Sequence, residues 1–182
     1  MPRTVTLRCR AKKQTDSTPK SVVGWREWAG LPNLGIDEIK VKIDTGARTS
    51  AVHAFNIRRI HKDGKDWVRF DVHPIQGNDT TSKTCKAEVV DYLWVTNSGG
   101  GREKRFLIVT MLRMGADAWP IEVTLTDRDQ MGFRMLLGRT AMERRLIVDP
   151  ARSYCLKRPI LKKGTSRPKP IHVAPPIAED EE

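Results

Sequence analysis

Residues 41–47 read Val-Lys-Ile-Asp-Thr-Gly-Ala, the most informative stretch of the chain. The alternating run 39–43 predicts a strand, which delivers the carboxylate of Asp44 at its end. Thr45 then supplies a β-branched hydroxyl, and Gly46 allows another backbone to approach closely. Because Asp-Thr-Gly arises by chance in roughly a few per cent of chains this long, its meaning depends on the sequence around it.

A second element of the same kind lies nearer the C-terminus. Residues 135–139 read Met-Leu-Leu-Gly-Arg, a short apolar run that ends at a glycine. The following residues 140–145 are expected to form the only helix, with Thr140 as N-cap and Glu143 at capping-box spacing. The pattern predicts a short strand that leads directly into a helix.

The rest of the central sequence predicts strands and tight turns. Expected strands at 85–96 and 105–114 flank the glycine-rich residues 97–101, a candidate lid. Two further apolar runs flank Asp63-Gly64, a hairpin signal, and residues 119–126 alternate again. Many short strands with one short helix predict a mainly β fold in a closed or folded arrangement.

Charge is distributed unevenly along the 182 residues, whose net charge is +11. Residues 1–20 carry +5 and residues 157–182 carry +2, which leaves +4 for residues 21–156. We therefore expect a flexible basic tail, one central domain and a Pro-rich charged tail within those bounds. No apolar run has the ~20 residues of a membrane helix. The start lacks a secretory h-region, and three scattered cysteines fit a reducing cytoplasm.

The order of these motifs resembles the retroviral-type aspartic proteases, the retropepsins. The resemblance covers about residues 22–156 and is sharpest over residues 105–145. More closely, the chain is similar to a bacterial group labelled ATP-dependent zinc proteases, whose cores read IDTGA-x-TSA-x-HA, LLGR-x-A and VDP. The matching residues in this chain are 43–54, 136–141 and 148–150.

The resemblance implies a closed β barrel of the acid-protease type with one short C-terminal helix and an inserted hairpin at Phe55–Lys83. It implies peptide-bond hydrolysis by two carboxylates that share one proton. The chain has a single Asp-Thr-Gly, so the second carboxylate would come from an identical subunit in a symmetric homodimer. Members of the group occur beside ATP-grasp ligases that add glutamate to a ribosomal protein, which implies a functional link to such a ligase.

The resemblance also assigns roles to residues. Asp44 would be the catalytic carboxylate, Thr45 would hydrogen-bond across the dimer, and Gly46 would complete the catalytic motif. Leu137, Gly138 and Arg139 would support the site. Peptide substrate would be contacted by Ala47, Arg48 and the tip residues Ser98, Gly99, Gly100 and Gly101.

One position departs from the viral enzymes, which have an Asp two residues after the motif glycine that pairs with the Arg of the Gly-Arg element. This chain has Arg48 there, so either Arg139 has another partner, such as Asp149 or Glu143, or the local geometry differs. We hypothesise that Arg48 faces the cleft and favours acidic substrates. Three further cations beside the predicted tip support the same hypothesis: Arg102, Lys104 and Arg105.

The ATP-dependent zinc label finds little support in the residues. The chain has no HExxH and no GxxxxGK[ST]. With Asp63-Gly64 as a two-residue turn, His53 and His73 would project from opposite faces of the hairpin, although a one-residue change of register would reverse this. The sequence therefore predicts no metal site and no cofactor.

Two other functions remain open. A zinc-dependent peptidase would be sensitive to chelators and contain zinc. A non-catalytic module of the same fold would bind RNA, the ribosome or an acidic protein through its basic tails. A purely nucleic-acid-binding role is the weakest interpretation, because residues 21–156 carry no recognised RNA- or DNA-binding motif.

Overall fold

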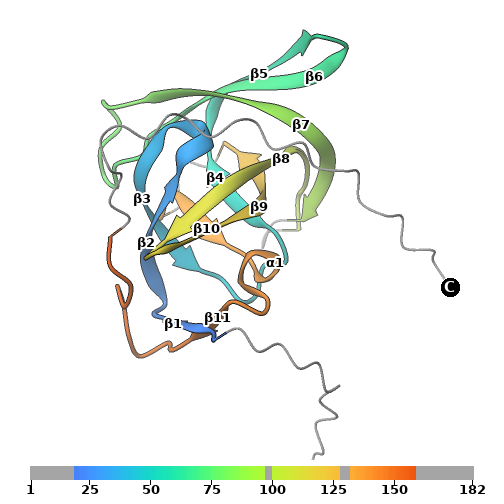
Figure 1. Cartoon of the computed structure of the whole chain (residues 1–182). Helices are drawn as coiled ribbons and strands as arrows, with labels where there is room; N and C mark the ends of the chain where they lie inside the picture. Colours follow the sequence, from blue (N-terminus) through green and yellow to red (C-terminus); the bar gives the residue numbers. More distant parts are fainter. Residues whose placement is uncertain (1–18, 97–99, 128–131, 159–182) are drawn as a thin grey trace, which may run out of the picture.

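A computed structural model describes residues 19–96, 100–127 and 132–158 (Figure 1). Nine strands form one sheet in the order β2-β3-β10-β4-β9-β8-β7-β6-β5. The strands are β2 (Arg26–Leu31), β3 (Ile36–Ile43), β4 (Ser50–His53), β5 (Phe55–Lys62), β6 (Lys65–Val72), β7 (Lys83–Thr96), β8 (Arg102–Met114), β9 (Asp117–Thr126) and β10 (Met135–Leu137). The expected mainly β fold is confirmed.

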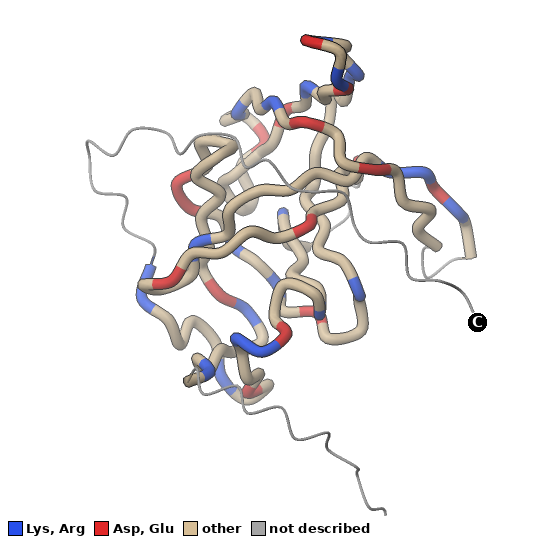
Figure 2. Tube along the Cα trace, turned by 45° about the vertical axis from the view of Figure 1, so that its right-hand side comes forward, with Lys and Arg blue, Asp and Glu red and all other residues tan. Residues whose placement is uncertain are grey.

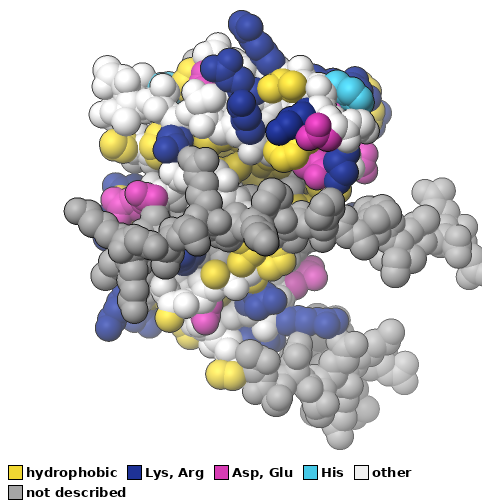
Figure 3. All heavy atoms as spheres, turned by 45° about the horizontal axis from the view of Figure 1, so that its top comes forward, with side chains coloured by type: hydrophobic (Ala, Val, Ile, Leu, Met, Phe, Trp, Pro, Cys, Tyr) yellow, Lys and Arg dark blue, Asp and Glu magenta, His cyan; other side chains and the backbone are white. Residues whose placement is uncertain are grey.

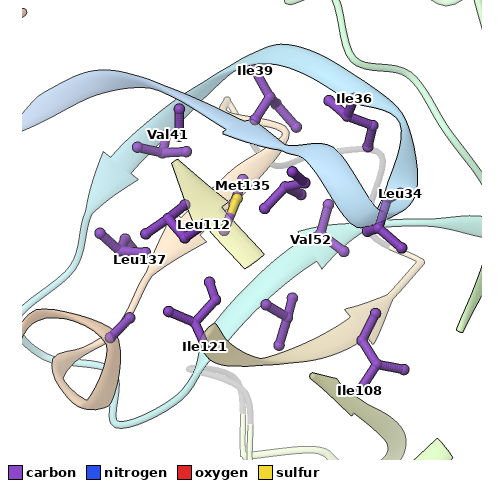
Figure 4. Packing of buried hydrophobic residues seen from close by; sticks show 14 of the residues in the cluster. Leu34, Ile36, Ile39, Val41, Val52, Ile108, Leu112, Ile121, Met135 and Leu137 are labelled. Atoms are coloured by element: carbon purple, nitrogen blue, oxygen red, sulfur yellow. The ribbon is translucent and has the colours of Figure 1, made fainter. Parts of the chain in front are cut away.

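The sheet folds back on itself through an additional pairing between β2 and β8, at Gly30 and Arg113. Strands β2, β3, β10, β4, β9 and β8 therefore form a ring of pairings. Alternation explains why they enclose a core: along β3, Ile39, Val41 and Ile43 are buried, and Ile36 is buried beyond a register shift in the pairing with β2. Figure 4 shows Ile36, Ile39 and Val41 together with apolar side chains from β4, β8, β9 and β10, inside the ring.

The short strand β10 lies between β3 and β4 in this ring. It pairs in parallel with β3, with Leu137 opposite Ile43, and antiparallel with β4 on its other side. The backbone N–H of Asp44 donates to the Leu137 carbonyl at 2.9 Å. The two apolar motifs of the sequence thus lie side by side, and Asp44 leaves the ring beside the Gly138 turn.

Two hairpins extend the sheet beyond the ring. The β5–β6 turn contains Asp63 and Gly64, both at positive φ, which confirms the predicted turn. Figure 2 shows charged residues recurring along this hairpin at the top of the molecule. The second hairpin joins the long strands β7 and β8.

A β-bulge in β5 corrects one prediction. The register shifts between Phe55 and Arg58, and Asn56 adopts φ 51°. His53 and His73 therefore lie on the same side, with ring centroids 6.5 Å apart. The expectation that they project from opposite faces is wrong. It assumed that the strand pairing set by the Asp63-Gly64 turn continues without a shift along the whole hairpin.

The helix also differs from its prediction. Helix α1 spans Arg139–Met142, after Gly138 in the N-cap position. Thr140 is not the cap, because its hydroxyl donates to the Arg48 carbonyl at 3.2 Å instead. A 3-10 turn, η1, covers Pro32–Leu34. No helix in the described part of the chain is long and apolar enough to cross a membrane.

The two ends of the described chain meet in a second, two-stranded sheet. Strand β1 (Ser21–Val23) pairs in parallel with β11 (Leu146–Val148). The expected tails, residues 1–20 and 157–182, fall almost entirely outside the described residues, so they stay predictions.

A buried carboxylate fixes the C-terminal segment to β2. Glu27 is 0% exposed, and its Oε1 accepts backbone N–H groups from Gly24 at 2.8 Å and Cys155 at 2.7 Å. Its Oε2 accepts the N–H of Leu156 at 3.2 Å. Three backbone donors thus satisfy a side chain that would otherwise be costly to bury.

Candidate active site

Asp44 begins a tight loop held by its own side chain. Its Oδ1 accepts the backbone N–H groups of Gly46 at 3.0 Å and Ala47 at 3.1 Å. Asp44 is half-buried, whereas Thr45 and Gly46 are exposed. A Cβ added to Gly46 would lie 3.2 Å from Asp44 Oδ1. The loop therefore holds the carboxylate in one orientation with Oδ1 occupied by backbone donors.

The Gly138 turn supports this loop from behind. The N–H of Gly138 donates to the hydroxyl of the fully buried Ser50 at 3.1 Å. The backbone N–H groups of the next two residues donate to the Ala47 and Arg48 carbonyls at 2.9 and 3.0 Å. A Cβ on Gly138 would meet the carbonyl carbon of Thr49 at 2.6 Å, so only glycine allows this close crossing.

Arg139 is anchored by the Asp44 loop itself. Its Nη1 donates to the carbonyl oxygens of Thr45 at 2.9 Å and Gly46 at 3.0 Å. The expected partners, Asp149 and Glu143, are therefore wrong. Two backbone carbonyl groups take the place of a carboxylate as its partners. Sequence patterns cannot reveal such partners, because every residue carries a carbonyl.

A cleft of about 650 Å³ opens above Asp44. It is lined by Asp44, Ala47 and Arg48, which we call its floor, and by residues of strands β7, β8 and β9, which we call its wall. Two carboxylates of that wall, Asp91 and Glu122, were not identified from the sequence. The sequence predicts the strands that carry them. It does not predict which side chains of β7 face the cleft, because the register of β7 shifts between Val89 and Asp91.

The cleft wall contains one buried cation. Arg105 is 6% exposed, and its Nε donates to Glu103 Oε2 at 2.9 Å. Its Nη2 is buried and has no hydrogen-bond partner among the described residues. Arg105 also lines the cleft, so its guanidinium lies near a carboxylate or carbonyl oxygen that enters there.

The other two cations grouped with Arg105 do not line the cleft. Arg102 lies over the ring of Trp94, 5.8 Å from its centroid, and Lys104 lies 4.7 Å from the ring centroid of Tyr92. Strand alternation separates them from Arg105. Of these three residues, which are close in sequence, only Arg105 lines the cleft.

The remaining predicted residues have varied positions. Leu137 is fully buried, and its neighbour Leu136 lines the cleft instead. Gly100, at φ 82°, and Gly101 lie at the β7–β8 tip and are exposed. Ser98 and Gly99 lie outside the described residues. The structure thus brings together the loop, the Gly138 turn and Arg48, and does not bring the described tip residues into the cleft lining.

The described residues contain no group of three or more His, Cys, Asp or Glu side chains placed to hold a metal ion. His53 is buried, and the Phe55 ring lies 4.4 Å from the ring of His73. His53 and His73 thus belong to an aromatic stack with Phe55.

Residues 22–159 match the sequence profile of the RimB-like family, described as retropepsin-like aspartic endopeptidase RimB. Proteins named probable alpha-L-glutamate ligase from Shewanella pealeana and Desulfotalea psychrophila are 46% and 48% identical over 140 and 132 residues. Those stretches cover 77% and 72% of this chain but only 31% and 28% of the relatives. The chain thus spans about a third of the length of these curated relatives.

A solved structure is also similar. The crystal structure of a Legionella pneumophila protein of unknown function (DUF785) is 28% identical, with a TM-score of 0.64. The similarity covers 76% of this chain and 100% of that protein.

Proposed function

The chain belongs to the RimB-like family of retropepsin-like aspartic endopeptidases, and on this premise we propose that it hydrolyses peptide bonds as a homodimer. Each subunit contributes Asp44 to a carboxylate pair at the two-fold axis. The observation that carries the proposal is the Asp44 loop at the floor of a cleft of about 650 Å³. The exposure of Thr45 and Gly46 supports it, because that edge of the loop is open to a second subunit.

The chemistry follows from two like charges at close range. Two carboxylates this close cannot both ionise and therefore share one proton. The ionised one takes a proton from the attacking water while the other protonates the carbonyl oxygen of the peptide. The N–H groups of Gly46 and Ala47 fix the Oδ1 of Asp44, so the second oxygen is directed to water and substrate. Arg139 keeps the loop in this geometry through the carbonyls of Thr45 and Gly46.

The favoured substrate is a protein with an acidic or glutamylated segment. Arg48 on the floor and Arg105 in the wall offer two guanidinium groups to substrate carboxylates. Asp91 and Glu122 line the same cleft, so the preference applies to the substrate positions beside the arginines and not to the whole cleft. The relatives named glutamate ligase support a link to glutamate addition, because a stretch similar to this chain is part of each of them.

Asp44→Asn tests the catalytic proposal. The substrate is an internally quenched peptide with a run of glutamates, and the matched control is Asp37→Asn, an exposed aspartate on β3. We expect kcat/KM to fall by at least about a hundredfold in Asp44→Asn and to stay unchanged in the control. Full activity in Asp44→Asn refutes the proposal.

The same assay separates the two alternatives. Loss of activity on treatment with EDTA, together with an active Asp44→Asn variant, would identify a zinc-dependent peptidase. Binding of the peptide without cleavage by the wild-type protein would identify a non-catalytic module.

Substrate preference is measured as the ratio of kcat/KM for glutamate-rich and glutamine-rich peptides. Arg48→Gln should lower this ratio by about tenfold, since a hydrogen bond to a charged group contributes roughly 1.5–3 kcal/mol. Lys42→Gln removes an exposed cation that does not line the cleft and should leave the ratio unchanged. An equal ratio in wild type and Arg48→Gln would end the acidic-substrate idea.

A further inference from the structure

Three cations lie side by side on the outer face of the β5–β6–β7 sheet. Arg58 pairs directly with Arg69, and Arg69 pairs directly with Lys86, so the three side chains share one face on adjacent strands. All three are exposed. We call them the cation row. Figure 3 shows Lys and Arg side chains gathered on the upper part of the molecule, where this hairpin lies.

The anions of this face form their hydrogen bonds with other side chains. Asp71 accepts hydrogen bonds from Asn56 Nδ2 at 2.9 Å and Thr84 Oγ1 at 2.7 Å. The hydrogen bonds from Thr84 and Asn56 lower the pKa of that carboxyl, and Arg69 lies close enough to lower the pKa further by its charge. Glu88 is engaged by Lys65, with Nζ and Oε1 2.6 Å apart. Among the described residues, no member of the cation row forms an ion pair.

The folded chain by itself does not account for the row. Like charges directly opposite on neighbouring strands destabilise a sheet. A cation on the edge strand β5 can be explained as protection against edge-to-edge aggregation. Arg69, however, lies on β6 and is paired on both sides, with Arg58 and with Lys86, whereas Lys86 precedes the part of β7 that pairs with β8. An anionic partner that binds across the strands would relieve the repulsion.

An aromatic side chain lies beside the row. Trp67 is two residues before Arg69 on β6 and therefore on the same face. It is half-buried, and Lys62 Nζ lies 5.9 Å from its ring centroid. An indole next to a line of cations on an open sheet surface combines base stacking with phosphate contacts.

We propose that the outer face of β5–β7, formed by the cation row and Trp67, binds single-stranded nucleic acid. The cation row contacts consecutive phosphates, and Trp67 stacks on one base. A nucleic acid is favoured over an acidic polypeptide because glutamates and aspartates have no aromatic face for Trp67. The face becomes visible only once strand pairing brings together residues that are 11 and 17 positions apart in sequence, which is why no motif in the sequence reveals it.

Fluorescence anisotropy with a labelled single-stranded oligouridine tests the proposal on the full chain. The row variant carries Arg58→Gln, Arg69→Gln and Lys86→Gln. Each lost phosphate contact lowers the slope of log affinity against log salt by about 0.7, so we expect the slope to fall by about 2 and Kd at 0.1 M salt to rise about tenfold or more. Its melting temperature should stay unchanged or rise, because the mutual repulsion is removed.

A charge-matched control carries Lys20→Gln, Lys42→Gln and Arg152→Gln, three exposed cations outside the outer face. Its Kd should change less than about twofold. Trp67→Leu should weaken binding by at least about fivefold, and Trp67→Phe should restore most of it. Both triple variants should retain peptidase activity.

Three results would overturn the proposal. The first is no binding of oligouridine by the wild-type chain. The second is equal loss of affinity in the row variant and the control, which would place binding elsewhere, for example on the basic residues 1–20. The third is binding of a labelled polyglutamate peptide that depends on the row while oligouridine does not bind, which would identify an acidic polypeptide as the partner.

Discussion

Gly138→Ala tests how the Asp44 loop is positioned. The turn at Gly138 crosses the backbone of Arg48 and Thr49 so closely that an added Cβ would lie 2.6 Å from the Thr49 carbonyl carbon and 2.7 Å from the Arg48 oxygen. Ordinary contact begins at 3.4 Å, so the two backbones must separate by roughly 0.8 Å. Backbone atoms cannot rotate away as a side chain can, and the whole loop must move.

The expected loss in the free energy of unfolding follows from the contacts that this separation disrupts. Overpacking of a buried site costs roughly 1–3 kcal/mol. The hydrogen bond from the buried Gly138 N–H to Ser50 Oγ, at 3.1 Å, lengthens as well. A buried donor left unsatisfied costs a further ~1–3 kcal/mol. With partial relaxation we expect a loss of about 3 kcal/mol, which lowers the melting temperature of a domain this size by about 6–12 °C.

Thermal unfolding followed by circular dichroism measures the loss, and peptidase activity reports the position of the loop. The matched control is Gly132→Ala, where an added Cβ meets no atom within 4 Å; its melting temperature should stay within about 2 °C of wild type. A Gly138→Ala protein that melts as the control does, with full activity, would refute the idea that this crossing sets the loop.

Three further perturbations test other parts of the structure. Glu27→Gln turns an acceptor of the Leu156 N–H into a donor, so stability measured by urea unfolding should fall by about 1–3 kcal/mol. Arg139→Lys keeps the charge but loses the planar fork. The decrease in peptidase kcat, expressed as a free energy, should therefore exceed the decrease in the free energy of unfolding. Hydrogen bonds from Thr84 and Asn56, with a smaller contribution from a nearby arginine, hold the pKa of Asp71 below its ordinary value of 3.8. Ionised Asp71 therefore stabilises the fold above that value, and the difference in melting temperature between wild type and Asp71→Asn should shrink as the pH falls below about 4.

The sequence predicts those parts of the fold that rest on local patterns. Alternation identifies the strands around Asp44, and Asp63-Gly64 identifies its hairpin turn, because a type of turn depends on the residues within it. The two apolar motifs on either side of the site were also predicted. These features need no knowledge of what lies across the sheet.

The parts that depend on register and on backbone partners could not be predicted. The bulge at Asn56 places His53 and His73 on the same side, and no residue pattern announces a bulge of this kind. The partners of Arg139 are carbonyl oxygens, which every residue carries. The cleft wall depends in the same way on which face of β7 and β8 turns inward.

The central claim is that two Asp44 side chains from two subunits form one catalytic site. Wild-type chain is refolded together with an equal amount of Asp44→Asn, and peptidase activity is compared with wild type refolded beside the same amount of buffer. Random pairing places about half of the wild-type chains in mixed dimers, so the account predicts that activity falls to about half, and further as more Asp44→Asn is added. Activity that stays constant as Asp44→Asn increases would show that each subunit works alone and would contradict the account.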